Sequence, residues 1–253
     1  MHGTDSFLGK RALITGGAKR LGREAAVALA HAGASVAIHF NTSREQADEL
    51  CREVEKIGSA AVALQADLGD PEAVEPLFTR AWDEFGGIDF LVNNASIFPA
   101  GRLNDLELED VHRNFQVNAW APFLLTRAFW RKINGTGIQG SVVNLLDTRL
   151  VGGDLAHVAY HLSKAALLEF TKLSALEFAP ELQVNGVAPG AVMPPEEHEE
   201  DYLDRLTANL PLKRRGYPGD IADATLFLLG SSFVTGQVIF VDGGRHLQPG
   251  GSP

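Results

Sequence analysis

A tyrosine, a lysine and an aspartate in one stretch of the chain could together deliver a proton. Tyr160 and Lys164 are four residues apart in a segment with helical spacing, so both are expected on one helix face. Asp147 precedes the tyrosine by thirteen residues. A cation beside a phenol makes it a better acid, whereas a carboxylate raises its pKa and holds its proton. These opposing neighbours favour a tyrosine that gives a proton and is reprotonated through Asp147. Alternatively, Asp147 only caps a turn.

The surrounding segments alternate between short apolar runs and helix-like stretches. Strands are predicted at 11–15, 35–40, 61–66, 88–93, 141–146, 182–188 and 237–242. Helices are predicted at 21–33, 43–58, 71–86, within 107–133 and at 158–178. The alternation predicts an α/β fold with one Rossmann-type, doubly wound parallel sheet and helices on both faces. Residues 1–253 are interpreted as a single domain, in which the Pro-rich stretch 191–217 is a flexible substrate-loop segment.

Composition excludes several classes of protein. The chain has 253 residues, is 45% apolar and carries a formal charge of −10, which disfavours a nucleic-acid surface. Its single cysteine, Cys51, allows no internal disulfide. The N-terminus has no apolar signal core, and no apolar run reaches the roughly 18–20 residues of a membrane span. We therefore expect a cytoplasmic protein with a small-molecule substrate and no membrane or nucleic-acid partner.

A glycine-rich turn, ITGGAKRLG (14–22), follows the first strand and opens the first helix. Gly16 and Gly22 stand where the backbone must turn tightly and pack closely, and free N–H groups at a helix start can bind a pyrophosphate. The second strand ends in HFNTSR (39–44), which lacks the acid that would bind an NAD ribose. With Lys19 and Arg20 nearby, this pattern predicts NADPH as the cofactor.

The chain combines several motifs: TGGAKRLG, NNAS (93–96), Asn118, the Tyr160–Lys164 pair, VAPG (187–190) and VDGG (241–244). In this combination it resembles the short-chain dehydrogenase/reductase family. The resemblance implies the catalytic residues Asn118, Asp147, Tyr160 and Lys164, with Asp147 where the family usually has serine. It also implies a homotetramer paired through the helices near 107–133 and 158–178. The implied cofactor-binding residues are Gly16, Lys19, Arg20, Leu21, Gly22, Phe40, Asn41, Thr42, Ser43, Asp67, Leu68, Asn94, Ala95, Ser96, Tyr160, Lys164, Pro189 and Gly190.

Three departures from the common pattern resemble the pteridine reductase branch, which includes dihydromonapterin reductases: Arg20 in AKRLG, Asp147, and NNASIF. This branch reduces pterins with NADPH. The likeness implies that the substrate, a pterin or folate, contacts Arg20, Ser96, Phe98, Asp147 and Tyr160, with Phe98 stacking on the pterin. An ionised aspartate cannot donate a hydrogen bond to a ketone oxygen, which also disfavours an ordinary carbonyl substrate.

Two other functions stay open at this stage. One is NADPH-dependent reduction of another small carbonyl or imine. The other is a non-catalytic dinucleotide sensor, although such a sensor would have no reason to keep a proton relay. No metal site is expected, because the helical pair His157 and His161 has no evident third ligand.

Overall fold

The computed structural model describes residues 7–193, 207–208 and 210–248, which form one seven-stranded parallel sheet. The strand order is β3-β2-β1-β4-β5-β6-β7. The strands are β1 (Arg11–Ile14), β2 (Ser35–Phe40), β3 (Ala61–Gln65), β4 (Phe90–Asn93), β5 (Gly140–Leu145), β6 (Leu182–Pro189) and β7 (Val238–Val241). The order reverses between β1 and β4, and a ligand of such a sheet binds at the carboxyl ends of these strands. The predicted Rossmann-type fold is confirmed.

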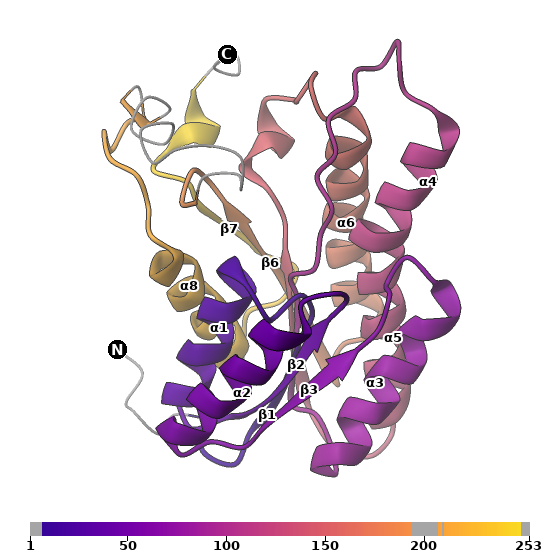
Figure 1. The fold of residues 1–253 in the computed structure, drawn as a ribbon, viewed down its shortest axis with the longest axis vertical. Coiled ribbons are helices and arrows are strands. Elements are labelled where there is room, and N and C mark those ends of the chain that lie inside the picture. Colours follow the sequence, from indigo (N-terminus) through magenta and orange to yellow (C-terminus); the bar gives the residue numbers. More distant parts are fainter. Residues whose placement is uncertain (1–6, 194–206, 209, 249–253) are drawn as a thin grey trace.

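Helices cover both faces of the sheet (Figure 1). On one side lie α1 (Arg20–His31), α2 (Arg44–Ile57) and α8 (Pro218–Gly230). On the other lie α3 (Pro71–Phe85), α4 (Leu108–Phe115), α5 (Ala121–Ile133) and α6 (Val158–Glu177). Among the described residues, no helix has the length and apolar character needed to cross a membrane.

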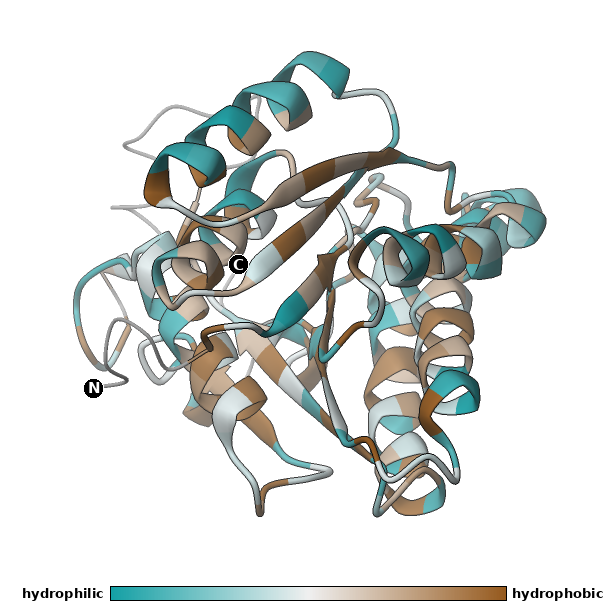
Figure 2. Ribbon diagram, turned by 90° about the horizontal axis from the view of Figure 1, so that it is seen from below, coloured by the Kyte–Doolittle hydropathy of each residue, from teal (hydrophilic) through white to brown (hydrophobic). Residues whose placement is uncertain are grey.

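The core has one layer on each face of the sheet. Every residue of β4 and β5 is buried, as expected for parallel strands covered on both faces. The helices turn apolar sides towards these strands and hydrophilic sides outwards (Figure 2). Local signals set their ends: the Asp70 side chain accepts a hydrogen bond from the Glu72 N–H at the start of α3, and Gly58 ends α2 with a φ of 102°.

Two parts of the fold differ from the sequence-based expectation. Helix α8 was not predicted, because its sequence PGDIADATLFLLG is apolar around most of its circumference and lacks a clear amphipathic period. The helical material within 107–133 is interrupted by a π-helical turn, Gln116–Trp120, between α4 and α5. Of the expected substrate-loop segment 191–217, residues 194–206 and 209 lie outside the described residues.

Candidate active site

A cavity of about 710 Å³ lies at the carboxyl ends of the strands where the strand order reverses. It is lined by loops that follow β1, β2, β3 and β4 and by one side of α4. The predicted cofactor residues among its lining are Gly16, Lys19, Arg20, Leu21, Asn41, Asp67, Leu68, Asn94, Ala95 and Ser96. Lining residues that sequence reasoning missed include His39, His112, Arg113 and Gln116. The cavity therefore brings together residues from four separate predicted loops.

The glycine-rich turn fits a closely approaching phosphate chain. Gly16 has a φ of +59°, which side chains rarely adopt, and a Cβ on Gly22 would lie 2.3 Å from the Gly16 carbonyl oxygen. The Asn94 amide braces this turn by donating to the carbonyl oxygens of Thr15 (2.9 Å) and Gly16 (3.0 Å). The turn is thus held open by backbone geometry that only glycine allows, as a dinucleotide site requires.

His39 also holds this turn, although the sequence analysis gave it no role. Its Nδ1 accepts a hydrogen bond of 3.0 Å from the Gly16 N–H, and its Nε2 lies 3.2 Å from the Ala66 carbonyl oxygen. An Nδ1 that accepts leaves the ring proton on Nε2, so the imidazole is neutral. Burial lowers the pKa of His39 to about 4. The signal available in the sequence for this role was a histidine near the end of a predicted strand.

Arg20 has an unusual backbone conformation for its residue type. Its φ is +55°, in the left-handed region where the corresponding pattern usually has glycine. Arg20 and Lys19 are both exposed and line the cavity together with Asn41. A non-glycine residue kept in a strained conformation points to a side chain that the site uses. A pair of cations at this position suits an anionic cofactor.

The end of β2 supplies no acid to the cavity. Phe40 ends the strand, and Asn41, Thr42 and Ser43 connect it to α2. Asn41 donates to the Asp67 carboxylate at 3.3 Å, which links the loops after β2 and β3. Arg44 forms an ion pair with Asp48 and lies 5.6 Å from the Phe40 ring centroid. Ser43 stands at the expected N-cap of α2, but its side chain makes no capping hydrogen bond.

Tyr160 and Asp147 are in direct contact. The Tyr160 hydroxyl donates to Asp147 Oδ2 at 2.7 Å, while Oδ1 accepts from the Arg149 N–H at 2.7 Å. Burial raises the pKa of Tyr160 well above its ordinary value, and the charge and hydrogen bond of Asp147 raise it further. Asp147 also caps the 3₁₀ turn Thr148–Val151. Asp147 therefore caps a turn with one oxygen and accepts the phenol hydrogen bond with the other, so it does more than cap the turn; its role in proton delivery stays a prediction.

Lys164 is fully buried next to Tyr160. Its Nζ donates to the Leu145 carbonyl oxygen at 2.6 Å and lies 5.7 Å from the Tyr160 ring centroid. Burial lowers the pKa of Lys164 to about 8, although the Asp147 charge works in the opposite direction. The groups that counter the Asp147 effect on Tyr160 include Arg149. Burial and Asp147 together outweigh this opposing charge, whereas the pull of Lys164 on the phenol, expected from the sequence, stays a prediction.

Asn118 lies on the π-helical turn and is fully buried. Its Oδ1 accepts from the Ser96 hydroxyl (3.1 Å) and the Ile97 N–H (2.9 Å). Its Nδ2 donates to the Ser163 hydroxyl at 3.0 Å. A π turn commonly marks a functional position in a helix. Here the π turn directs the Asn118 amide, which joins the loop after β4 to α6. The catalytic role of Asn118 stays a prediction.

Phe98 forms an aromatic wall beside Tyr160. Its ring meets the Tyr160 ring edge-on at 4.6 Å and stacks on the His157 ring at 3.8 Å. The Arg149 guanidinium carbon lies 4.7 Å from the Phe98 ring centroid. Phe98 is 38% exposed, so it packs in its loop and still presents surface to a ligand. Asp154 contacts both Arg149 and His157 and so belongs to the same cluster. The sequence analysis gave no role to Arg149 or Asp154.

The remaining predicted residues lie at the same edge of the sheet. Pro189 ends β6, and Gly190 follows with its N–H bonded to the Val241 carbonyl oxygen at 2.9 Å. A Cβ on Gly190 would lie 2.5 Å from Asp242 Cα, so the close approach requires glycine. Within residues 7–193, 207–208 and 210–248, no group of three metal-ligating side chains gathers. His157 Nδ1, from the helical pair His157 and His161, lies within hydrogen-bond distance of Asp154 Oδ2.

Comparison with known proteins identifies the family. Residues 16–246 match the family model described as enoyl-(acyl carrier protein) reductase. A relative that is 33% identical, versicolorin reductase of Emericella nidulans, aligns over 96% of this chain and 99% of its own length. The chain belongs to the short-chain dehydrogenase/reductase family. It is accordingly an NAD(P)-dependent oxidoreductase of that family.

Two solved structures are similar over almost their whole length. The FolM alternative dihydrofolate reductase 1 from Brucella canis, complexed with NADP, has a TM-score of 0.91 and 32% identity, covering 96% of both chains. A blue fluorescent protein from a metagenomic library, in complex with NADPH, has a TM-score of 0.85 and 33% identity. It covers 94% of this chain and 98% of its own. Both neighbours bind the cofactor type that the sequence predicts here.

Proposed function

We propose that this protein is an NADPH-dependent reductase of pterins or folates that reduces a ring C=N bond. The observation that carries the proposal is the 2.7 Å hydrogen bond from the Tyr160 hydroxyl to the Asp147 carboxylate. Asp147 stands where the family usually has a serine whose hydroxyl donates a hydrogen bond to a ketone oxygen of the substrate. A similar structure that is named as a dihydrofolate reductase supports the same substrate class.

The described residues suit NADPH in three ways. The glycine turn leaves room for the pyrophosphate, since a Cβ on Gly22 would collide with Gly16. Lys19 and Arg20 supply positive charge where a 2′-phosphate would need it, and no acid ends β2. When bound, NADPH supplies a hydride. Lys164 is the residue that would bond the nicotinamide ribose.

The chain's own residues would manage the proton. In C=N reduction the carbon takes the hydride and the nitrogen takes a proton, so the site must deliver one proton per turnover. Tyr160 keeps its proton at neutral pH because its pKa is raised. After it donates, the phenolate takes a proton back through Asp147, which is only half-buried and can exchange protons with water. Asp147 can also accept hydrogen bonds from amino and ring N–H groups of a pterin.

The proposal predicts a distinctive substrate profile. NADPH oxidation should be measured with dihydrobiopterin, dihydrofolate and an activated diketone, each with NADH as the control cofactor. We expect turnover with the pterin or folate and NADPH, and slower turnover with NADH. Reduction of the diketone alone would assign the site to carbonyl substrates. Absence of turnover with every substrate, with NADPH still bound, would assign the protein to dinucleotide sensing.

We also infer a cytoplasmic homotetramer. Apolar side chains on the outer side of α6 and the preceding π turn are solvent-exposed in one subunit: Trp120 (44%), Leu173 (57%) and Leu176 (80%). Exposed apolar surface of this kind favours association, and closed symmetry buries it. Light scattering at micromolar concentration should give the mass of four chains. A monomer at that concentration would contradict the inference.

A further inference from the structure

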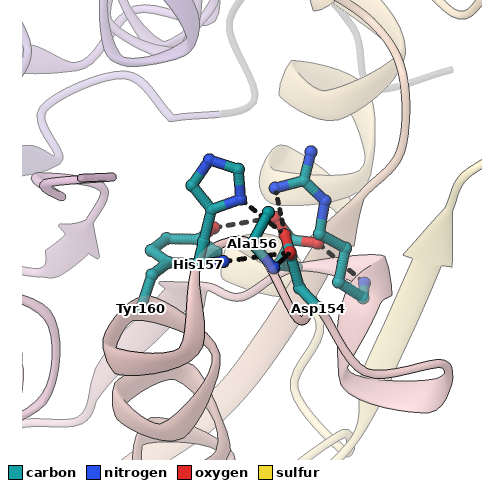
Figure 3. A network of polar contacts seen from close by, with 6 residues as sticks. Asp154, Ala156, His157 and Tyr160 are labelled. Atoms are coloured by element: carbon teal, nitrogen blue, oxygen red, sulfur yellow. Dashed lines mark hydrogen bonds and ion pairs between the residues drawn. The ribbon is translucent and has the colours of Figure 1, made fainter. Parts of the chain in front are cut away.

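The Asp154 carboxylate uses its two oxygens for different purposes. Its Oδ1 accepts from the N–H groups of Ala156 (2.9 Å) and His157 (3.1 Å) at the start of α6. Its Oδ2 lies 3.0 Å from Arg149 Nη1 and 3.0 Å from His157 Nδ1 (Figure 3). The Asp154 side chain is only 11% exposed. One oxygen thus holds the turn that leads into α6, and the other contacts the side chains of Arg149 and His157.

Asp154 is ionised at neutral pH. Burial works to raise its pKa, but the Ala156 N–H hydrogen bond and the charge of Arg149 outweigh that effect and lower the pKa below its usual range. Charge-assisted hydrogen bonds of this kind are stronger than neutral ones and fix direction as well as distance. The His157 ring and the Arg149 guanidinium are therefore held in defined orientations.

Both held groups contact Phe98. His157 stacks on its ring with an interplanar angle of 18°, and the Arg149 guanidinium carbon lies 4.7 Å from its centroid. Backbone hydrogen bonds between Gly101 and the 156–158 segment join the two loops: Gly101 N–H to Ala156 O (2.7 Å) and Val158 N–H to Gly101 O (3.0 Å). Stacking and cation–π contacts gain most from fixed geometry.

We propose that Asp154 is a positioning residue: it holds His157 and Arg149 against Phe98 and so fixes the aromatic wall beside Tyr160. The aromatic wall touches the proposed proton donor, because the Phe98 and Tyr160 ring centroids are 4.6 Å apart. Asp154 itself acts only through these neighbours. The effect of this wall on substrate binding rests on the proposed pterin reduction, whereas the ring contacts do not.

Asp154→Asn separates the two uses of the carboxylate. The amide oxygen can still accept from the Ala156 and His157 N–H groups, but the amide nitrogen is a donor and cannot pair with the Arg149 guanidinium. Asp70→Asn is the matched control, since Asp70 also accepts from the backbone N–H two residues further on, at 3.0 Å. Thermal unfolding of both variants should stay close to that of the unaltered protein.

The wall can be observed without any substrate. With 4-fluorophenylalanine at position 98 alone, Asp154→Asn should shift or broaden the fluorine NMR resonance, and Asp70→Asn should leave it unchanged. Adding Arg149→Met to Asp154→Asn should change the resonance little further, because the Arg149 contact is already released. A resonance that Asp154→Asn does not alter would overturn the positioning role, whatever the substrate of the enzyme is.

Kinetics then test the effect on substrate. Loss of one aromatic or cation–π contact should raise the KM for dihydropterin about three- to tenfold. The KM for NADPH should change less than about twofold, because the cofactor cavity is untouched. The kcat should change less than the pterin KM, because Asp154 makes no hydrogen bond to Tyr160 or Asp147 and contributes to the raised pKa of Tyr160 only through its charge. A fall in kcat with unchanged pterin KM would overturn the role assigned to the wall. If the unaltered enzyme reduces no pterin, the proposed function fails, and the fluorine measurement alone decides the positioning role.

Discussion

The Tyr160 hydroxyl donates a 2.7 Å hydrogen bond to Asp147 Oδ2, so the phenol of this site is paired with a carboxylate. Burial and this carboxylate both raise the pKa of Tyr160, while Lys164 directs its Nζ to the Leu145 carbonyl oxygen. The phenol is therefore a weak acid that keeps its proton until a basic substrate atom accepts it. A ring nitrogen that gains electrons on hydride transfer is such an atom.

Tyr160→Phe removes the proton donor and keeps the ring that packs on Phe98. We expect the rate of pterin reduction to fall about 10²–10⁴-fold, the range for positioned acid catalysis. NADPH should still bind to the variant, as measured by its fluorescence, although the Tyr160 hydroxyl is itself one of the predicted cofactor contacts. Near-normal turnover in this variant would place the proton donor elsewhere.

Lys164 should set an upper limit on the working pH. Its pKa is about 8 in the free protein, because burial disfavours the charged form. Above that pH the lysine loses its charge, so kcat/KM for NADPH should fall as pH rises through about 8. The Asp147 charge raises the Lys164 pKa. Asp147→Asn should therefore move this falling limb to lower pH. A limb that stays in place would mean that another group titrates.

Arg20→Gly should separate stability from cofactor binding. Glycine adopts a φ of +55° without the penalty of about 1–2 kcal/mol that a side chain incurs there. The variant should thus unfold at an equal or higher temperature, while the KM for NADPH rises and the preference for NADPH over NADH weakens. Lower stability together with unchanged cofactor preference would show that Arg20 serves the fold.

Much of the fold could be predicted from the sequence because its signals are local. The period of apolar residues and the glycine stops placed six of the seven strands within one residue of their observed ends, and the largest difference is at β4, which begins at Phe90 rather than at 88. The spacing of Asp147, Tyr160 and Lys164 also predicted that these side chains lie together, as they do, since the loop after one strand and one helix carry all three. Helix α8 was missed because an almost wholly apolar helix has no readable period.

The rest of the site depends on contacts between distant segments. Phe98 meets Arg149 and His157 where the loop with Gly101 pairs with the start of α6. His39 acquires its role from Gly16, which lies 23 residues away in the turn after the neighbouring strand β1. The π turn at Asn118 has no sequence signature of its own. Residue types alone could not reveal these partners.

His39 should make the fold sensitive to mild acid. Its pKa is about 4 in the folded protein and 6.5 in an unfolded chain, so the unfolded state binds more protons between these values. Stability is therefore lost as pH falls, by about 2 kcal/mol between pH 7 and pH 5. Denaturant unfolding at several pH values measures this loss. An asparagine at position 39 can still accept from the Gly16 N–H and does not titrate. The loss of stability between pH 7 and pH 5 should therefore be smaller in His39→Asn by about 2 kcal/mol. Equal losses would contradict the neutral, buried histidine.

The central claim concerns Asp147 and can be tested with two substitutions. Asp147→Asn keeps the size and one accepting oxygen but removes the charge, the second acceptor and proton exchange, so pterin reduction should fall about 10²-fold while NADPH affinity holds. Asp147→Ser restores the usual family residue. It should also impair pterin reduction, yet reduce an activated diketone as well as the unaltered enzyme does, or better, because a hydroxyl can donate to a carbonyl oxygen.

The most direct measurement is the rate of dihydropterin reduction with NADPH as a function of pH, for the unaltered enzyme and for Asp147→Asn. We predict a large loss in the variant across the whole working range, with the cofactor still bound. If Asp147→Asn reduces dihydropterin at the unaltered rate and with the same pH profile, Asp147 only caps its turn, and the proton path proposed here is wrong.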